Sequence, residues 1–149
     1  MTKSRRTEFD ERALADAAIA ARDAAHAPYS EYRVGAALLC ADGTVVAGCN
    51  VENASYGLTV CAERNAVFAA VAAGERRFTA VAVATEDGGS PCGACRQVLR
   101  EFCPPPQDRR FGILLVDGKG RIKRRRTLAE LLPESFGPET LGRPRRPKT

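Results

Sequence analysis

Two short stretches decide how this chain folds and which chemistry it can carry: Cys61-Ala62-Glu63 and Pro91-Cys92-Gly93-Ala94-Cys95. Their three cysteines, Cys61, Cys92 and Cys95, can hold a zinc ion, which prefers tetrahedral sulfur and nitrogen ligands. Three protein ligands leave the fourth position open, as a catalytic zinc site requires, and a water bound there would have its pKa lowered toward about 7. Glu63, two residues after the first ligand, would then be placed to move protons at that position.

A structural zinc site is the alternative. In zinc ribbons a fourth cysteine or histidine closes the metal shell. The other cysteines supply no convincing fourth ligand, because Cys40 and Cys49 flank a predicted turn and Cys103 precedes three prolines. A purely structural site would also leave Glu63 unexplained, so we favour the catalytic interpretation.

The composition indicates a single globular domain. The chain has 149 residues, of which 44% are hydrophobic and 28% charged, enough to bury a core. Residues 1–8 are polar and charged apart from Met1 with no apolar stretch behind them, so we expect no secretory signal, and no apolar run approaches the roughly 18 residues of a membrane span. Six cysteines in such a chain are typical of reduced thiols and metal ligation. We therefore expect a cytoplasmic protein.

The net charge of +5 is unevenly distributed, because basic residues gather in residues 109–126 and again in the tail 143–149. A nucleic-acid-binding surface is one interpretation of this pattern. A solvated strand edge followed by a disordered tail is the favoured one, since few aromatic residues that could stack on bases lie among these charges.

Hydrophobic spacing predicts one α/β domain without internal repeats or linkers. The expected helices are residues 8–25, 61–73, 92–102 and 127–132. The expected strands are residues 33–40, 44–49, 78–85, 110–116 and 121–124. Both cysteine segments therefore follow a loop and begin a helix, where free N–H groups and the helix dipole stabilise thiolates.

Two arginines lie close to the cysteines in sequence. Zinc with three thiolates carries a formal charge of −1, which would weaken its effect on a bound water. Arg64 and Arg96 could offset part of that charge. For Arg96, a surface salt bridge is an equally good interpretation.

Several further stretches, in the same order, resemble the small homotetrameric type of cytidine deaminase. The similarity covers residues 25–141. The stretches that carry it are Pro28-Tyr29-Ser30, Val34-Gly35-Ala36-Ala37-Leu38, residues 48–56, Cys61-Ala62-Glu63-Arg64, residues 91–97, Leu131-Leu132-Pro133 and Phe136-Gly137-Pro138.

This resemblance implies a three-layer α/β fold, with a mixed central sheet of about five strands flanked by helices. We expect a single domain of this type over residues 1–141, and the basic tail over residues 142–149, which we expect to be disordered, lies outside the resemblance and is assigned no function. The resemblance also implies one zinc ion per subunit on Cys61, Cys92 and Cys95, with Glu63 as the catalytic acid and base, and a homotetramer with shared active sites.

The resemblance also assigns substrate contacts. Asn50 and Glu52 would bind the ribose hydroxyls, although both residue types are equally ordinary as loop caps. The backbone of Ala62 would hold the base carbonyl, and Tyr56 would line the pocket wall. Phe136 would reach a neighbouring subunit and stack on its pyrimidine, whereas on its own it would be interpreted as a packing anchor.

Two residues depart from the family pattern. Tyr32 stands where phenylalanine is usual, and its added hydroxyl needs a partner, so it could modestly shift substrate preference. His26, the only histidine, stands where an aromatic residue is usual before Pro-Tyr-Ser, and we expect it to be a loop or packing residue rather than a ligand.

The leading hypothesis is therefore hydrolysis of cytidine and 2′-deoxycytidine to the uridines with release of ammonia, in pyrimidine salvage. Glu63 would protonate N3 and later the leaving amine. The second hypothesis is a deaminase of another amino-heterocycle, such as a blasticidin-type nucleoside. Residues 50–54 argue against it, because they resemble a segment that binds ribose. A nucleic-acid-binding or editing protein is the third, and it predicts binding that weakens steeply with salt.

Overall fold

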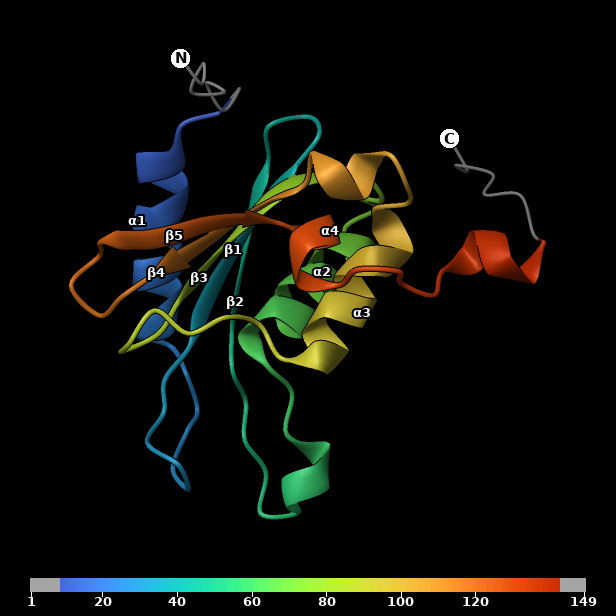
Figure 1. Cartoon of the computed structure of the whole chain (residues 1–149). Coiled ribbons are helices and arrows are strands. Elements are labelled where there is room, and N and C mark those ends of the chain that lie inside the picture. Colours follow the sequence, from blue (N-terminus) through green and yellow to red (C-terminus); the bar gives the residue numbers. More distant parts are fainter. Residues whose placement is uncertain (1–8, 143–149) are drawn as a thin grey trace.

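The computed structural model describes residues 9–142. Its centre is a mixed sheet of five strands in the order β2-β1-β3-β4-β5 (Figure 1). Only β3 and β4 are parallel, and the other neighbouring pairs are antiparallel. The strands are β1 (Gly35–Cys40), β2 (Val45–Cys49), β3 (Phe78–Ala84), β4 (Gly112–Val116) and β5 (Ile122–Thr127).

Helices cover both faces of the sheet. Helix α1 (Glu11–Arg22) packs on one face, and α2 (Ala62–Ala72) and α3 (Gly93–Phe102) lie on the other (Figure 1). Side chains alternate accordingly along the strands, so that Ala37 belongs to the core under α1 while its neighbour Leu38 belongs to the core under α2. The predicted three-layer fold with a five-stranded mixed sheet is confirmed.

Close contact between α1 and the sheet depends on glycine. A β-carbon at Gly35 would lie 2.1 Å from the carbonyl oxygen of Ala18 and 2.4 Å from the backbone nitrogen of Arg22. No side chain fits that space, so the absence of a β-carbon lets the first residue of β1 touch the helix backbone. The α1 side of the core is correspondingly rich in alanine, which shortens the distance between helix and strands.

The element ends differ from the sequence prediction by a few residues. Helix α1 is shorter than residues 8–25 because Asp10 caps it, accepting a hydrogen bond from the Ala13 N–H at 3.0 Å. Strand β5 extends to Thr127, which then caps the short helix α4 (Leu128–Leu131) in a reciprocal capping box with Glu130. Three 3₁₀ turns, which hydrophobic spacing cannot reveal, complete the chain: η1 (Tyr56–Leu58), η2 (Gln107–Arg109) and η3 (Pro138–Leu141).

The chain after α4 forms an arm that runs past α3 and projects from the body at η3 (Figure 1). Arg100 of α3 anchors it, because its buried guanidinium pairs with Glu139 and donates to the Ser135 hydroxyl at 2.6 Å. The predicted tail, residues 142–149, lies outside the described residues apart from Gly142. Within residues 9–142, every helix is too short or too polar to cross a membrane.

Candidate zinc-binding active site

Helices α2 and α3 bring the two cysteine segments together, because they pack side by side on the same face of the sheet. Cys61 is the residue that caps α2 and Cys92 the residue that caps α3, and both have extended backbone angles. Neither side chain bonds to a free N–H of its own helix. Cys95 follows in the first turn of α3, so all three sulfurs lie at two adjacent helix N-termini.

The three sulfurs have the spacing that tetrahedral zinc requires. Sγ of Cys92 lies 3.9 Å from Sγ of Cys61 and 3.5 Å from Sγ of Cys95. A zinc–sulfur bond of about 2.3 Å with tetrahedral angles predicts a sulfur–sulfur separation of about 3.8 Å. Among residues 9–142, no other cysteine, histidine, aspartate or glutamate belongs to this cluster. The donor set therefore fits a zinc ion with three protein ligands and one open position.

Exposure differs among the ligands. Cys92 is exposed, Cys61 is half-buried and Cys95 is buried. The cluster thus opens to solvent on the Cys92 side, where a small molecule could approach, and is closed by the core on the Cys95 side.

Glu63 projects from the first turn of α2 beside the sulfurs. Its side chain is buried, and Oε2 lies 3.6 Å from Sγ of Cys95. Burial raises the pKa of this carboxyl, and the negative charge of the Cys61 thiolate raises it further. A carboxyl whose pKa is raised in this way, next to a metal site, is suited to accept and return a proton.

Arg64 is directed at the sulfurs. Its NH2 group donates to Sγ of Cys61 at 3.4 Å. Hydrogen bonds from the Cys95 thiol and from Arg64 lower the pKa of Cys61 to about 5, although burial opposes this, whereas the bond to Cys61 and burial raise the pKa of Cys95. Nε of Arg64 is buried without a hydrogen-bond partner among the described residues. The Arg64 guanidinium thus lies against the Cys61 sulfur, where its positive charge favours the thiolate that a zinc ion would bind.

Arg96 is directed elsewhere. Its guanidinium donates to the carbonyl of Pro91 at 2.7 Å, to the carbonyl of Leu131 at 2.7 Å and to the Ser90 hydroxyl at 3.0 Å. It therefore fixes the loop that enters α3 and joins that helix to α4. Charge compensation by Arg96 stays a prediction, and it would act over distance rather than through a bond to sulfur.

Asn50 and Glu52 hold the segment between α1 and β1. Oδ1 of Asn50 accepts from the Val34 N–H at 2.9 Å, and its Nδ2 donates to the Tyr32 carbonyl at 2.8 Å. Glu52 accepts from the backbone N–H groups of Tyr29 and Ser30 and from the Ser30 hydroxyl. Both side chains therefore cap the loop, as one of the two interpretations expected. Sugar binding by the same two residues stays a prediction.

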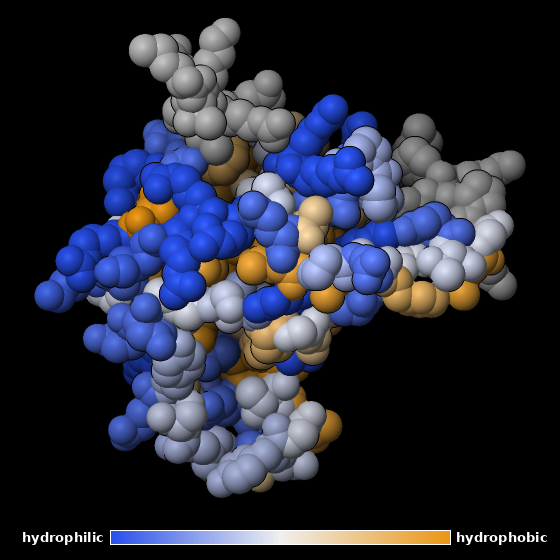
Figure 2. Space-filling model, in the orientation of Figure 1, coloured by the Kyte–Doolittle hydropathy of each residue, from blue (hydrophilic) through white to orange (hydrophobic). Residues whose placement is uncertain are grey.

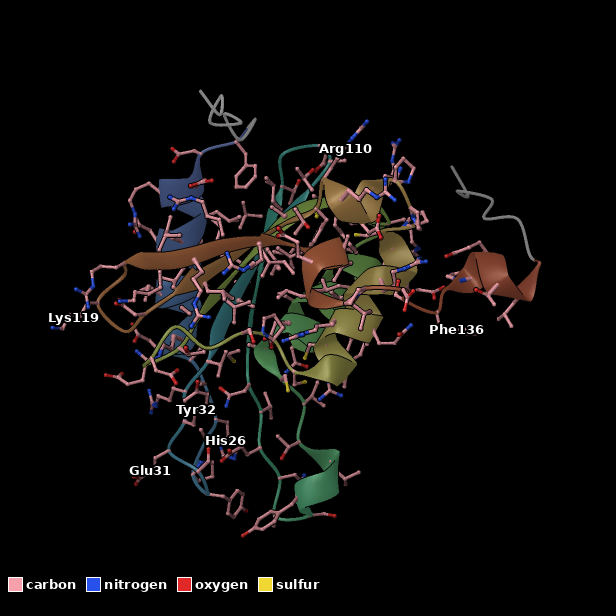
Figure 3. All side chains as sticks on the ribbon, viewed as in Figure 1. His26, Glu31, Tyr32, Arg110, Lys119 and Phe136 are labelled. Carbon is pink, nitrogen blue, oxygen red and sulfur yellow. The ribbon has the colours of Figure 1, made fainter. Side chains whose placement is uncertain are left out.

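The remaining predicted contacts lie further apart. Ala62 is fully buried at the start of α2, next to the cysteines. Tyr56 is 74% exposed on η1, edge-to-face with Tyr29. Phe136 is 57% exposed and lies on the side of α3 away from Tyr32 and His26 (Figure 3). The structure thus assembles the three cysteines, Glu63 and Arg64, and it holds the Phe136 backbone against α3, where the Gln97 side chain donates to the Phe136 carbonyl at 3.1 Å.

Sequence reasoning missed the residues that hold the site's loops. The Tyr32 hydroxyl donates to Oδ1 of Asp87 at 2.8 Å, across 55 residues of sequence. No motif marks Asp87 or Ser30 as partners, and the only sequence signal was a tyrosine where phenylalanine is usual.

Comparison with known proteins agrees with this geometry. Residues 7–106 match the family described as the cytidine and deoxycytidylate deaminase zinc-binding region. A cytidine deaminase from Sporosarcina psychrophila is 50% identical over 123 residues, which cover 81% of this chain and 87% of that protein. One from Halalkalibacterium halodurans is 48% identical over 135 residues, covering 89% and 98%. The crystal structure of cytidine deaminase from Burkholderia pseudomallei superposes with a TM-score of 0.78 at 48% identity, covering 86% of this chain and 100% of that one.

Proposed function

The chain belongs to the zinc-binding cytidine and deoxycytidylate deaminase family, and from that premise we propose that it hydrolyses free cytidine and 2′-deoxycytidine to the corresponding uridines and ammonia. We place this activity in pyrimidine salvage. We also place it in the cytoplasm, where thiol ligands remain reduced.

One observation carries the proposal: three sulfurs at zinc-ligand spacing lie beside a buried carboxyl that is not a ligand. Sγ of Cys95 is 3.5 Å from Sγ of Cys92 and 3.6 Å from Oε2 of Glu63. A structural zinc site has no use for a buried carboxyl with a raised pKa, because burial of such a group costs stability. A hydrolytic site does, since protons must be moved at the reacting atoms.

Bound zinc would supply a Lewis acid that activates water at neutral pH. Glu63 then carries the protons of the reaction. Its carboxylate takes one proton from the attacking water and gives it to N3 of the pyrimidine as the C4–O bond forms. It next moves the proton of the new C4 hydroxyl to the amino group, so that the C4–N bond breaks, ammonia leaves and the C4 carbonyl remains.

The sugar contacts remain compatible with the hydrogen bonds of Asn50 and Glu52. Asn50 uses one N–H and one acceptor position, and a carboxamide has two of each. Among residues 9–142, Oε2 of Glu52 accepts from the Ser30 hydroxyl and from no other group, so it has a lone pair left for a sugar hydroxyl. Both residues can therefore hold the loop and still bind a ribose hydroxyl.

We further propose that the protein is a homotetramer in which Phe136 completes the site of a neighbouring subunit. The support is its position: Phe136 is 57% exposed and Leu141, further along the same arm, 64%. Figure 2 shows apolar surface along this projecting arm. An exposed apolar arm is typical of a segment that a partner subunit covers.

A substrate panel tests the proposal. Zinc-loaded protein is incubated with cytidine, 2′-deoxycytidine, blasticidin S and a cytidine-containing single-stranded oligonucleotide, and ammonia and deaminated product are measured. We expect turnover of the two free pyrimidine nucleosides alone. Turnover of the oligonucleotide alone, of blasticidin S alone or of none would refute it.

A further inference from the structure

Tyr32 is 43% exposed, yet its backbone N–H, its backbone carbonyl and its hydroxyl all form hydrogen bonds. Its N–H donates to the Ser30 hydroxyl at 3.0 Å, and its carbonyl accepts from Nδ2 of Asn50 at 2.8 Å. Its hydroxyl donates to Oδ1 of Asp87 at 2.8 Å. An exposed tyrosine side chain normally has rotational freedom. Here the hydroxyl bond to Asp87 restricts it, while the two backbone bonds fix the segment that carries it.

The partner of the hydroxyl is part of a second small network. Oδ1 of Asp87 also accepts from the Thr85 hydroxyl at 3.1 Å, and that hydroxyl accepts from the Gly89 N–H at 2.8 Å. Gly89 fits closely beneath the tyrosine, because a β-carbon there would lie 3.2 Å from the Tyr32 hydroxyl oxygen. Thr85 itself is buried, so this network is anchored at the end of β3.

The two networks meet at a functionally relevant place. Residues 85–91 form the loop that follows β3 and leads into Cys92, the cap of α3. Residues 27–34 form the segment that Asn50 and Glu52 hold. Figure 3 shows Tyr32 at the side of this segment that is nearer the loop after β3, with His26 and Glu31 farther from that loop. The hydroxyl bond to Asp87 joins the two.

We propose that the Tyr32 hydroxyl and Asp87 form a positioning pair. The pair holds residues 27–34, the segment bonded to the proposed ribose ligands Asn50 and Glu52, in register with residues 85–91, the loop that precedes the proposed zinc ligand Cys92. The inference rests on the proposed function and adds a determinant of nucleoside affinity to it. Phenylalanine, usual at this position in the family that the sequence resembles, cannot make the bond.

The pair acts on binding rather than on chemistry, since neither group reaches the sulfurs or Glu63 in the described structure. Loss of a contact that orients substrate equally in the ground and transition states raises KM and leaves kcat unchanged. For Tyr32→Phe we expect KM for cytidine to rise about threefold to tenfold, the effect of one hydrogen bond, with kcat within about twofold.

A double-mutant cycle identifies the partner. Asp87→Ala should reproduce the KM increase, and the Tyr32→Phe, Asp87→Ala double variant should add nothing further. Asp87→Asn keeps an acceptor for the hydroxyl and should restore most of the affinity. Asp16→Ala is the matched control for Asp87→Ala, because it removes an exposed carboxylate that pairs with Arg12 on α1, outside both networks. Its KM should equal that of the wild type.

Hydrogen exchange provides a readout that does not depend on activity. If the pair joins the two segments, Tyr32→Phe should speed amide exchange in residues 85–91, the Gly89 N–H included, and Asp16→Ala should not. Additive effects in the cycle, an unchanged KM in Tyr32→Phe, or unchanged exchange in residues 85–91 would overturn the inference. An inactive wild type would instead refute the proposed function, and the nucleoside role of the pair with it.

Discussion

At the residue scale, the site depends on side chains whose chemistry is set by two or three neighbours. Cys92 is exposed, and its sulfur lies within 3.9 Å of both other sulfurs. Without the Cys92 thiol, a zinc ion at this site would have only two protein ligands. Zinc affinity depends on the number of thiolates, and a hydroxyl in place of one of them is a poor zinc ligand.

Cys92→Ser should therefore lose zinc and activity together while the fold survives. We expect a zinc content well below one ion per chain after dialysis, and turnover lowered by at least about 100-fold. Cys49→Ser is the control, because Cys49 on β2 does not belong to the cluster of Cys61, Cys92 and Cys95. Metal analysis and an unchanged circular dichroism spectrum check the result, and full zinc retention in Cys92→Ser would contradict the ligand assignment.

Asp117, after β4, gives the molecule a defined acid response. Burial opposes ionisation of its carboxyl, but hydrogen bonds from the backbone N–H groups of Arg121 and Lys119 and from the Arg121 side chain hold its pKa below the usual value. A lowered pKa means that the stabilisation is complete above about pH 4 and is lost as pH falls through the folded-state value.

Asp117→Asn keeps Oδ1 as an acceptor for both N–H groups and loses the charge together with the Oδ2 acceptor of the Arg121 side chain. Its Tm should lie about 2–4 °C below that of the wild type at pH 7, and the difference should shrink as the pH drops below about 4. Asp16→Asn, which removes an exposed ion pair with Arg12, should change Tm little at any pH. Thermal melts over a pH series decide, and a difference that does not change with pH would rule out this linkage.

At the scale of elements, local sequence patterns predicted most of the fold. The continuous apolar run of β1, the Val-Ala alternation of β3 and the capping pattern at Thr127 are local, so they were recognisable. The zinc ligands were predictable because two of them belong to one CxxC and the third lies next to Glu63. The bond between Tyr32 and Asp87 was not, since it joins distant loops whose approach depends on how β1 and β3 pair.

Gly35 shows how one residue sets the distance between two elements. Gly35→Ala would drive a β-carbon into the backbone of α1, 2.1 Å from the Ala18 carbonyl oxygen, so helix and strand must separate. We expect a loss of about 3 kcal/mol in the free energy of unfolding. Gly57→Ala, where a β-carbon meets nothing within 4 Å, should change it by less than about 0.5 kcal/mol. Denaturant unfolding measures both, and equal stabilities would contradict the packing argument.

At the scale of the whole molecule, each active site is proposed to need two chains. Arg100 holds the arm through Ser135 and Glu139, and Gln97 donates to the Phe136 carbonyl, so Phe136 is carried at a defined place on the arm. If a neighbour supplies this aromatic ring, two chains with different defects can repair each other in a mixed oligomer.

Co-expression of Glu63→Ala with Phe136→Ala should therefore restore activity. Each variant alone should be impaired, and random mixing should return up to about a quarter of the wild-type activity, in sites that pair an intact Glu63 with an intact neighbouring Phe136. Activity of the co-expressed oligomer equal to the average of the separate variants would show that the arm serves only its own chain or no site at all.

The central claim is that Glu63 moves the protons of cytidine hydrolysis beside a zinc ion on Cys61, Cys92 and Cys95. The most direct measurement compares the rate of uridine formation by the wild type and by Glu63→Gln at equal zinc content. The account predicts that the variant keeps its zinc and loses about 10³-fold or more in kcat, because an amide of the same shape cannot accept or return a proton. A zinc-loaded Glu63→Gln variant with a near wild-type rate would contradict it.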